Sequence, residues 1–262
     1  MGGSPPSPVE ADFPARSASR CGELGELDAH VVQCRACPRL VAWREEVAAT
    51  KRAAFQEWEY WGRPVPGFGP PDAALAVVGL APAAHGGNRT GRMFTGDASG
   101  DILFAALYAV GLASQPNSTH RGDGLELRGV RVTAPVHCAP PQNKPTPAER
   151  DACRPWLATE LELLGPSLRA VVVLGAFGWQ ALLPVLGHAG WQLPRPRPAF
   201  GHGAEVTLPG SGAKKELHLF GCYHPSRRNT STGRITFPML VHVFRRASTV
   251  SGLDQRAPAL PE

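Results

Sequence analysis

The chain has 262 residues, of which 43% are hydrophobic, and this length and composition predict one domain of about 200 to 250 residues with a substantial core. Lysine and arginine total 27 against 22 aspartate and glutamate residues, and the formal charge of +5 permits a polyanionic partner without requiring one. The sequence contains no run of about 18 apolar residues, and its start lacks the order of a secretory signal, so we expect a cytoplasmic protein without a membrane partner.

Both ends of the chain have a composition that is typical of poorly ordered segments. Residues 1–20 are rich in Pro, Ser, Gly and Ala without apolar periodicity, and residues 251–262 are similar. The domain is therefore predicted to cover residues 21–250. Within it, the Pro/Gly-rich stretches 63–71 and 194–212 are predicted to be surface loops.

Short apolar runs alternate with helical patterns between these ends. The runs that predict buried strands are 75–80, 130–136, 170–174 and 217–222, and the segments that predict helices are 102–112, 146 onward, 177–186 and 238–246. Thr146, Pro147 and Glu149 form a helix-start pattern, whereas Pro155 is expected to bend or restart that helix. The alternation predicts a single-domain α/β/α sandwich with a central four-stranded parallel sheet.

Four of the six cysteines fall into two pairs. These are Cys34 with Cys37, separated by two residues, and Cys138 with Cys153, separated by fourteen. In a reducing compartment such pairs are better explained as metal ligands than as disulfides, and four thiolates hold either tetrahedral zinc or a [4Fe-4S] cluster. The alternative, small buried apolar side chains, suits Cys21 and Cys222, which have no close cysteine partner.

Ligands of open α/β sheets bind beyond the carboxyl ends of the strands, so the segments after the predicted strands are the first candidates for a site. The first strand leaves into the Gly79–Ala83 loop, whose glycine and proline allow backbone amides to approach a ligand. Phe94 and Asp97 follow before a predicted helix and present an aromatic face and a carboxylate, which suit a planar base. The segment 224–229 (HPSRRN) adds an imidazole, a rigid turn and two guanidinium groups after the last strand.

Together, the 79–83 loop, the 94–97 stretch, the His-Pro-Ser turn and the four-cysteine spacing resemble the uracil-DNA glycosylase superfamily, and most of all its iron-sulfur type 5 branch. The resemblance covers roughly residues 34–246. It implies hydrolysis of the N-glycosidic bond of uracil and of other deaminated or damaged bases such as hypoxanthine in DNA. It also favours a [4Fe-4S] cluster over zinc at Cys34, Cys37, Cys138 and Cys153.

The first motif departs from the pattern of the other types of this superfamily. Those relatives carry Asp, Asn or Glu at the second or third position, where this chain has Leu80 and Ala81. By resemblance to the type 5 branch, Asp97 is the candidate that activates water, and the alternative is a helix cap. His224 is predicted to donate a hydrogen bond to the departing base, although a lone histidine is usually structural.

The remaining candidates concern binding of the base and of DNA. Asn143 is predicted to bind the edge of a flipped base and to contribute to catalysis, with an Asx turn before Pro145 as the alternative. Phe94 is predicted to stack on the base, or else to belong to the core. The other candidate substrate-binding residues are Gly79 and Ala81, and the candidate DNA-binding residues are Arg227, Arg228 and Asn229, whose alternative is a solvated basic loop.

We therefore expect a monomeric, cytoplasmic, nucleoid-associated repair glycosylase. One alternative is a strictly uracil-specific iron-sulfur glycosylase, against which the missing polar residue after Gly79 argues. A second is a non-catalytic nucleic-acid binding module shaped by its cluster, and a third is a zinc protein with an unrelated hydrolase activity.

Overall fold

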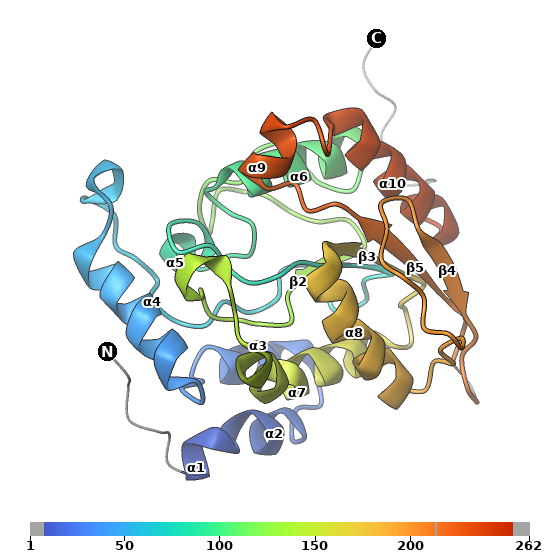
Figure 1. Ribbon diagram of the computed structural model, residues 1–262, viewed down its shortest axis with the longest axis horizontal. Coiled ribbons are helices and arrows are strands. Elements are labelled where there is room, and N and C mark those ends of the chain that lie inside the picture. The colour runs from blue at the N-terminus through green and yellow to red at the C-terminus, as the bar shows by residue number, and fades with distance from the viewer. Residues whose placement is uncertain (1–7, 213, 254–262) are drawn as a thin grey trace.

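The computed structural model describes residues 8–212 and 214–253, and its centre is a five-stranded sheet (Figure 1). Four parallel strands lie in the order β2-β1-β3-β5, and β4 pairs with the outer side of β5 in the antiparallel direction. Their bounds are β1 Leu75–Val78, β2 Val130–Thr133, β3 Ala170–Leu174, β4 Glu205–Leu208 and β5 Leu217–Cys222. The predicted α/β sandwich with four parallel strands is confirmed, and a fifth strand extends the sheet.

The strand β4 lies within the stretch 194–212, which was predicted to be a loop. Of its four residues only Leu208 is fully buried, while Glu205 and Thr207 are exposed, so the strand carries too little apolar alternation to be found from the sequence. Its stability comes from pairing with β5, as in Val206 opposite Leu219. At the other edge of the sheet, Phe68 exchanges two backbone hydrogen bonds with Val132 of β2, at 2.9 and 2.8 Å.

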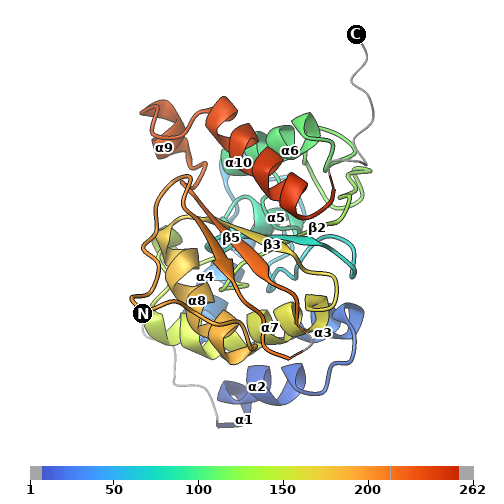
Figure 2. The ribbon, with the colours of Figure 1, turned by 90° about the vertical axis from the view of Figure 1, so that its right-hand side faces the viewer.

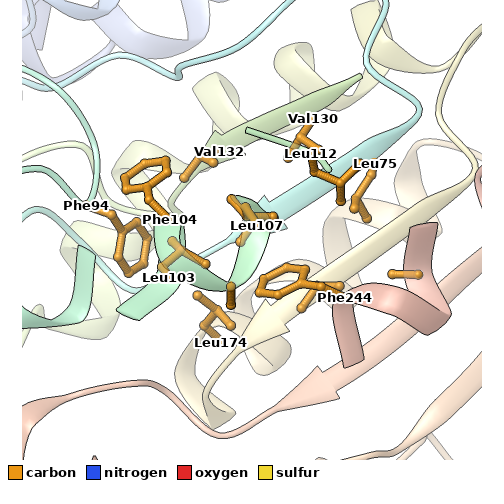
Figure 3. Close-up of a cluster of buried hydrophobic side chains, with 14 of the residues drawn as sticks. Leu75, Phe94, Leu103, Phe104, Leu107, Leu112, Val130, Val132, Leu174 and Phe244 are labelled. Atoms are coloured by element: carbon orange, nitrogen blue, oxygen red, sulfur yellow. The ribbon is translucent and has the colours of Figure 1, made fainter. Parts of the chain in front are cut away.

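One face of the sheet is covered by α6 (Ala98–Ala109) and α10 (Phe237–Val250), which also pack on each other (Figure 2). Figure 3 shows the core between them, where strand side chains meet the helices. Those labelled include Leu75, Val130, Val132 and Leu174 from the strands, Leu103 and Leu107 from α6, and Phe244 from α10. Burial of each such side chain contributes about 1.5–3 kcal/mol, which explains why the buried strands consist of nearly continuous apolar residues.

The opposite face of the sheet is covered by α7 (Pro147–Leu164) and α8 (Ala176–His188), with α3 (Leu24–Val31) packed on α7. The α7 start pattern is confirmed, because Thr146 Oγ1 accepts from the Glu149 amide at 3.2 Å and the Glu149 carboxylate accepts from the Thr146 amide at 2.7 Å. Pro155 does not restart the helix, which is continuous through it. Trp156 and Leu157 are buried just after it, and their packing offsets the lost hydrogen bond.

Residues 8–20 form helices, contrary to the expectation of a poorly ordered segment from 1 to 20. These are α1 (Pro8–Ala11) and α2 (Phe13–Ala18), and α2 packs against α7 with the Phe13 ring edge-on to Trp156 at 6.0 Å. Helices this short have little stability alone, so tertiary contact decides their formation. At the other end, Leu253 is buried. The rest of both segments, 1–7 and 254–262, lies outside the described residues.

The remaining short elements lie in the segments between these layers. They are α4 (Pro38–Thr50), η1 (Ala53–Phe55), α5 (Gly87–Thr90), η2 (Pro141–Asn143) and α9 (Arg227–Ser231). In Figure 1, α4, α5 and α9 lie around the side of the sheet at which the parallel strands end. Within the described part of the chain, none of the helices has the length and apolar character needed to cross a membrane.

Candidate active site

The carboxyl ends of the parallel strands surround one cavity of about 320 Å³. Each segment after a predicted strand contributes to it, as the strand-end rule for α/β sheets requires. The lining residues are Leu80, Ala81, Ala83, Phe94, Asp97, Ser99, Asn143, Leu174, Gly175, Ala176, Phe177, His224 and Ser226. Five predicted site residues, Ala81, Phe94, Asp97, Asn143 and His224, therefore come together from segments far apart in the chain.

Phe94 is held in the cavity wall by two glycines. A Cβ atom on Gly79 would lie 2.7 Å from two carbons of the Phe94 ring, and one on Gly100 would lie 1.7 Å from the Phe94 carbonyl oxygen. Phe94 itself has a φ of 52°, which is uncommon for a bulky side chain. Gly79 thus supports the aromatic wall from behind and is not among the lining residues.

Asp97 both caps a helix and lines the cavity. Its Oδ1 accepts hydrogen bonds from the amides of Ser99 at 2.9 Å and Gly100 at 3.1 Å, at the start of α6. Its Oδ2 accepts none from the described residues, and a Cβ on Gly86 would lie 2.1 Å from it. Burial raises the pKa of Asp97 above its usual value, while the two amides and the Arg89 cation act in the opposite direction.

His224 follows β5 and is largely enclosed. Burial lowers its pKa to about 4, so the imidazole is neutral at physiological pH. Its Nδ1 is buried without a hydrogen-bond partner among the described residues, and its ring stacks on Phe94 with centroids 5.8 Å apart and planes at 29°. A neutral imidazole in an apolar wall is suited to hydrogen bonding with a polar ligand.

The turn after His224 is stabilised from within. The Asn229 side-chain amide donates to the His224 carbonyl oxygen at 2.9 Å, and Ser226 caps α9 by accepting from the Asn229 amide nitrogen at 3.4 Å. Asn229 is therefore engaged with the turn. Arg227 and Arg228 are exposed and form no ion pair with a described carboxylate.

Asn143 reaches the cavity from the segment after β2. It is exposed, and its side chain makes no hydrogen bond to the described residues, so the alternative of an Asx turn is absent. Asn143 and the preceding Gln142 have φ values of 55° and 54°. Two consecutive non-glycine residues in the left-handed region store strain, which is concentrated at functional sites in proteins.

The four paired cysteines line a second, small and mostly apolar cleft. Cys34 follows α3, Cys37 precedes α4, Cys138 follows β2 and Cys153 lies in α7. Burial, with smaller contributions from neighbouring thiols, raises the pKa of Cys37 to about 12 and that of Cys138 to about 11. Among the described residues, no group of three or more His, Cys, Asp or Glu side chains has an arrangement that holds a metal ion.

Arg44 contacts this cysteine cleft from α4. It is 2% exposed, and its Nη1 donates to the Cys138 sulfur at 2.9 Å and to the Cys34 carbonyl oxygen at 3.2 Å. The only carboxylate near its guanidinium within the described residues is Glu45, at 3.8 Å, which also pairs with Arg35. A buried cation therefore faces the sulfur atoms directly.

The cysteine cleft and the cavity share a wall. Cys37 and Cys138 pack in one small apolar cluster with Ala81 and Phe177, both of which line the cavity. Phe177 was not singled out from the sequence, although it lies in the segment after the third predicted strand. The sequence pattern does not identify Arg44 as a functional residue, because its importance depends on contacts with residues far away along the chain.

Comparisons with known proteins agree with this geometry. A family model described as the uracil DNA glycosylase superfamily matches residues 66–247. The type-5 uracil-DNA glycosylase of Mycobacterium tuberculosis is 53% identical over 237 residues, which cover 90% of this chain and 85% of that protein. The type-5 uracil-DNA glycosylase of Thermus thermophilus is 52% identical, covering 84% and 94% of the two chains.

A more distant relative gives a useful contrast. The type-4 uracil-DNA glycosylase of Sulfurisphaera tokodaii is 28% identical over 184 residues, which cover 70% of this chain and 72% of that protein. Identity to the type-5 proteins is thus nearly twice as high. The chain belongs to the uracil DNA glycosylase superfamily, in which it groups with the type-5 uracil-DNA glycosylases.

Proposed function

We propose that this protein is a DNA glycosylase that removes uracil in base excision repair by hydrolysing its N-glycosidic bond and leaving an abasic site. The observation that carries the proposal is the cavity at the strand ends, where Phe94, Asp97, Asn143 and His224 converge. It is supported by identities of about 50% to proteins named type-5 uracil-DNA glycosylases over most of the chain.

The cavity suits a single base that has left the DNA stack. Its volume of about 320 Å³ lies at the small end of ligand sites, and extrusion of a base costs a few kcal/mol, least for a mispaired one. The Phe94 ring offers a stacking surface. The free side chain of Asn143 offers a donor and an acceptor to the edge of the base.

In the proposed mechanism, His224 assists the departing base. As the glycosidic bond breaks, its electron pair stays on the base and the sugar gains oxocarbenium character. A neutral imidazole that donates a hydrogen bond to the base stabilises the developing negative charge, and does so more effectively in an enclosed site than in water.

Asp97 supplies the carboxylate that the first motif lacks. The capping bonds to Oδ1 fix its orientation, and Oδ2 remains available to accept a hydrogen bond from a water molecule. In the proposed mechanism the ionised carboxylate orients that water toward the anomeric carbon and accepts its proton.

We propose further that substrate choice is broad. The wall next to the base consists of Leu80, Ala81 and Ala83, which present no side-chain donor or acceptor. Selective rejection of an analogue requires buried polar groups that would be left unpaired, and this wall has none. Hypoxanthine is therefore an expected substrate beside uracil.

We propose that the four cysteines hold a [4Fe-4S] cluster whose role is to link separate elements. Four thiolates can also hold a single zinc ion, which is smaller than the cluster. Four cysteines with an arginine beside one sulfur suit the larger, anionic cluster. Its thiolates would fasten α4, the segment after β2 and α7 together.

DNA is the partner that this function requires, and we propose that the protein acts on nucleoid DNA as a monomer. The exposed Arg227 and Arg228 lie beside the turn that bears His224, and in this proposal they neutralise phosphates next to the flipped nucleotide. Asn229 then contributes to DNA binding by holding the turn.

The test uses duplex oligonucleotides that carry one uracil or one hypoxanthine, with alkali-labile abasic sites as the readout. We expect the wild type to act on both and His224→Ala to be slower by on the order of 100-fold or more. The control is His188→Ala, an exposed histidine at the end of α8. Cleavage of uracil alone would indicate a strict enzyme, and tight DNA binding without cleavage a non-catalytic module.

A further inference from the structure

Arg89 is a buried cation next to the cavity whose role the mechanism leaves open. It lies in α5, is 4% exposed and forms no ion pair with a described carboxylate. Its Nε donates to the His85 carbonyl oxygen at 2.7 Å, and its Nη2 donates to the Gly96 carbonyl oxygen at 2.9 Å. One guanidinium thus joins two points of the loop that are eleven residues apart.

These two carbonyls flank the free oxygen of Asp97. Gly96 directly precedes Asp97, and His85 directly precedes Gly86, whose missing side chain leaves room for Asp97 Oδ2. The two hydrogen bonds of Arg89 therefore fix the distance between the Gly96–Asp97 backbone, which carries the carboxylate, and the His85–Gly86 backbone, against which the carboxylate packs. The planar guanidinium fork of arginine, which has several donors in a fixed geometry, suits such a bridge better than the single ammonium group of lysine.

A distant segment of the chain holds Arg89 in place. The guanidinium carbon lies 3.9 Å from the Phe55 ring centroid and 4.2 Å from that of Trp58. Both rings belong to the segment between α4 and β1, which projects beyond the end of α4 in Figure 1. Cation–π contacts of a desolvated arginine are worth more than exposed ones. In the same segment, the Tyr60 hydroxyl lies 3.0 Å from His85 Nδ1.

We propose that Arg89 is a positioning residue that holds Asp97 in its reactive place and keeps its carboxylate ionised, with Phe55 and Trp58 as its clamp. The inference rests on the proposed role of Asp97 in orienting water. The titratable groups around Asp97 are Arg89 from α5, Asp101 from its own helix and His224, which follows β5 and lines the same cavity. His224 is neutral, and besides the backbone amides of Gly100 and Ser99 the group that favours ionisation of Asp97 is the Arg89 cation.

The experiment measures single-turnover uracil excision as a function of pH. Arg89→Met is expected to slow excision by about 10- to 100-fold and to move the acidic limb of the rate profile to higher pH, because loss of the cation raises the pKa of Asp97. Arg89→Lys keeps the charge and loses the fork, so its rate falls while its acidic limb stays near that of the wild type.

Two further measurements separate positioning from general stabilisation. In the Asp97→Asn background, Arg89→Met is expected to change the rate by less than about twofold, since the group it positions is already inactive. If Arg89→Met does not fold, Phe55→Leu keeps the Arg89 cation and removes part of its clamp, so we expect slower excision with an acidic limb near that of the wild type, as for Arg89→Lys. Arg169→Met is the matched control, because Arg169 also donates to two backbone carbonyls, at the opposite end of β3.

The outcomes are distinguishable. The inference is overturned if Asp97→Asn is slow while Arg89→Met keeps the wild-type rate. It is also overturned if Arg89→Met slows excision equally in the wild-type and the Asp97→Asn backgrounds. Either result leaves the proposed function intact. Full activity of Asp97→Asn would overturn both the role of Asp97 and this inference. Absence of uracil excision by the wild type would instead refute the proposed function.

Discussion

At the scale of single residues, the cavity combines a histidine that burial keeps neutral with an aspartate whose ionised form is favoured by its neighbours. Burial alone keeps His224 neutral, whereas two backbone amides and the Arg89 cation counter the effect of burial on Asp97. In the proposed mechanism, the first side chain hydrogen-bonds to the departing base and the second accepts a proton from water. Such divergence within one cavity is typical of sites that carry out acid–base chemistry.

The neutral state of His224 predicts a loss of stability in acid. Its folded pKa of about 4 lies below the ordinary value of 6.5, so between these values the unfolded chain takes up a proton that the folded protein does not. The contribution of His224 to stability is full above pH 6.5 and is lost as the pH falls toward 4. Between pH 7.5 and pH 5, the free energy of unfolding measured in urea should fall less for His224→Gln than for the wild type, by on the order of 1 kcal/mol. An equal decline in both proteins would contradict the assignment.

Gly79 predicts a loss of both stability and activity on substitution. A methyl group at this position would lie 2.7 Å from the Phe94 ring, so the ring must move away from its place in the cavity wall. Gly79→Ala is expected to lose about 1–3 kcal/mol of unfolding free energy and most of its uracil excision. Thermal unfolding and single-turnover kinetics measure the two effects. Gly22→Ala controls for removal of a glycine as such, because Gly22 has no positive φ and an added Cβ would lie 3.8 Å from its nearest neighbour, the Glu26 carboxylate.

At the scale of elements, α4 connects the cysteine cleft with the cavity. Arg44 donates to the sulfur of Cys138, and its own backbone carbonyl accepts from the buried Asn88 side chain of α5 at 3.1 Å. The helix thus joins the cysteines to the loop that contains Arg89. A charge placed among sulfur ligands is one of the means by which a protein tunes a bound cluster.

Replacement of Arg44 should weaken retention of the proposed cluster. Arg44→Met removes the hydrogen bond to Cys138 and the positive charge that faces the thiolates, so bleaching of the brown protein by a chelator should be at least about tenfold faster. Arg35→Met serves as the control, because Arg35 pairs with Glu45 at the surface. An unchanged bleaching rate would show that Arg44 acts only in packing.

At the scale of the whole molecule, the layers of the sandwich are fixed by apolar contact, and the proposed cluster would add a second connection between them. Strand residues of alternating register face α6 and α10 on one side and α7 and α8 on the other. The cysteine cleft lies between α4 and α7, and through Ala81 and Phe177 it adjoins the cavity.

Removal of the proposed cluster should therefore affect catalysis as well as stability. Without it, four thiols remain beside the buried Arg44 cation, and the wall formed by Ala81 and Phe177 loses its support. Chelation is expected to lower the thermal midpoint by several degrees and to abolish uracil excision. Cys21→Ser should retain iron like the wild type. Full activity of iron-free protein would show that the two sites are independent.

The sequence predicted the four parallel strands and most of the cavity wall, because buried strands leave apolar runs and their ends meet at one edge. It missed α2 and β4, which are short and depend on contact with Trp156 and β5. It assigned Asn229 to DNA binding, which stays a prediction, and it did not reveal that the Asn229 side chain holds the His224 backbone. Arg44 and Arg89 were not recognised as functional, because their partners lie in other segments and leave no periodic signal.

Both edges of the sheet carry features that disfavour pairing with a further strand. On the β5 side, β4 ends the sheet with the exposed Glu205, which pairs with Arg246 at 2.9 Å, and on the β2 side Phe68 occupies backbone groups of Val132. Open edges with unpaired amides are templates for association between copies of a chain. The short, charged β4 and the bridge at Phe68 are therefore expected to disfavour edge-to-edge association between copies of this chain.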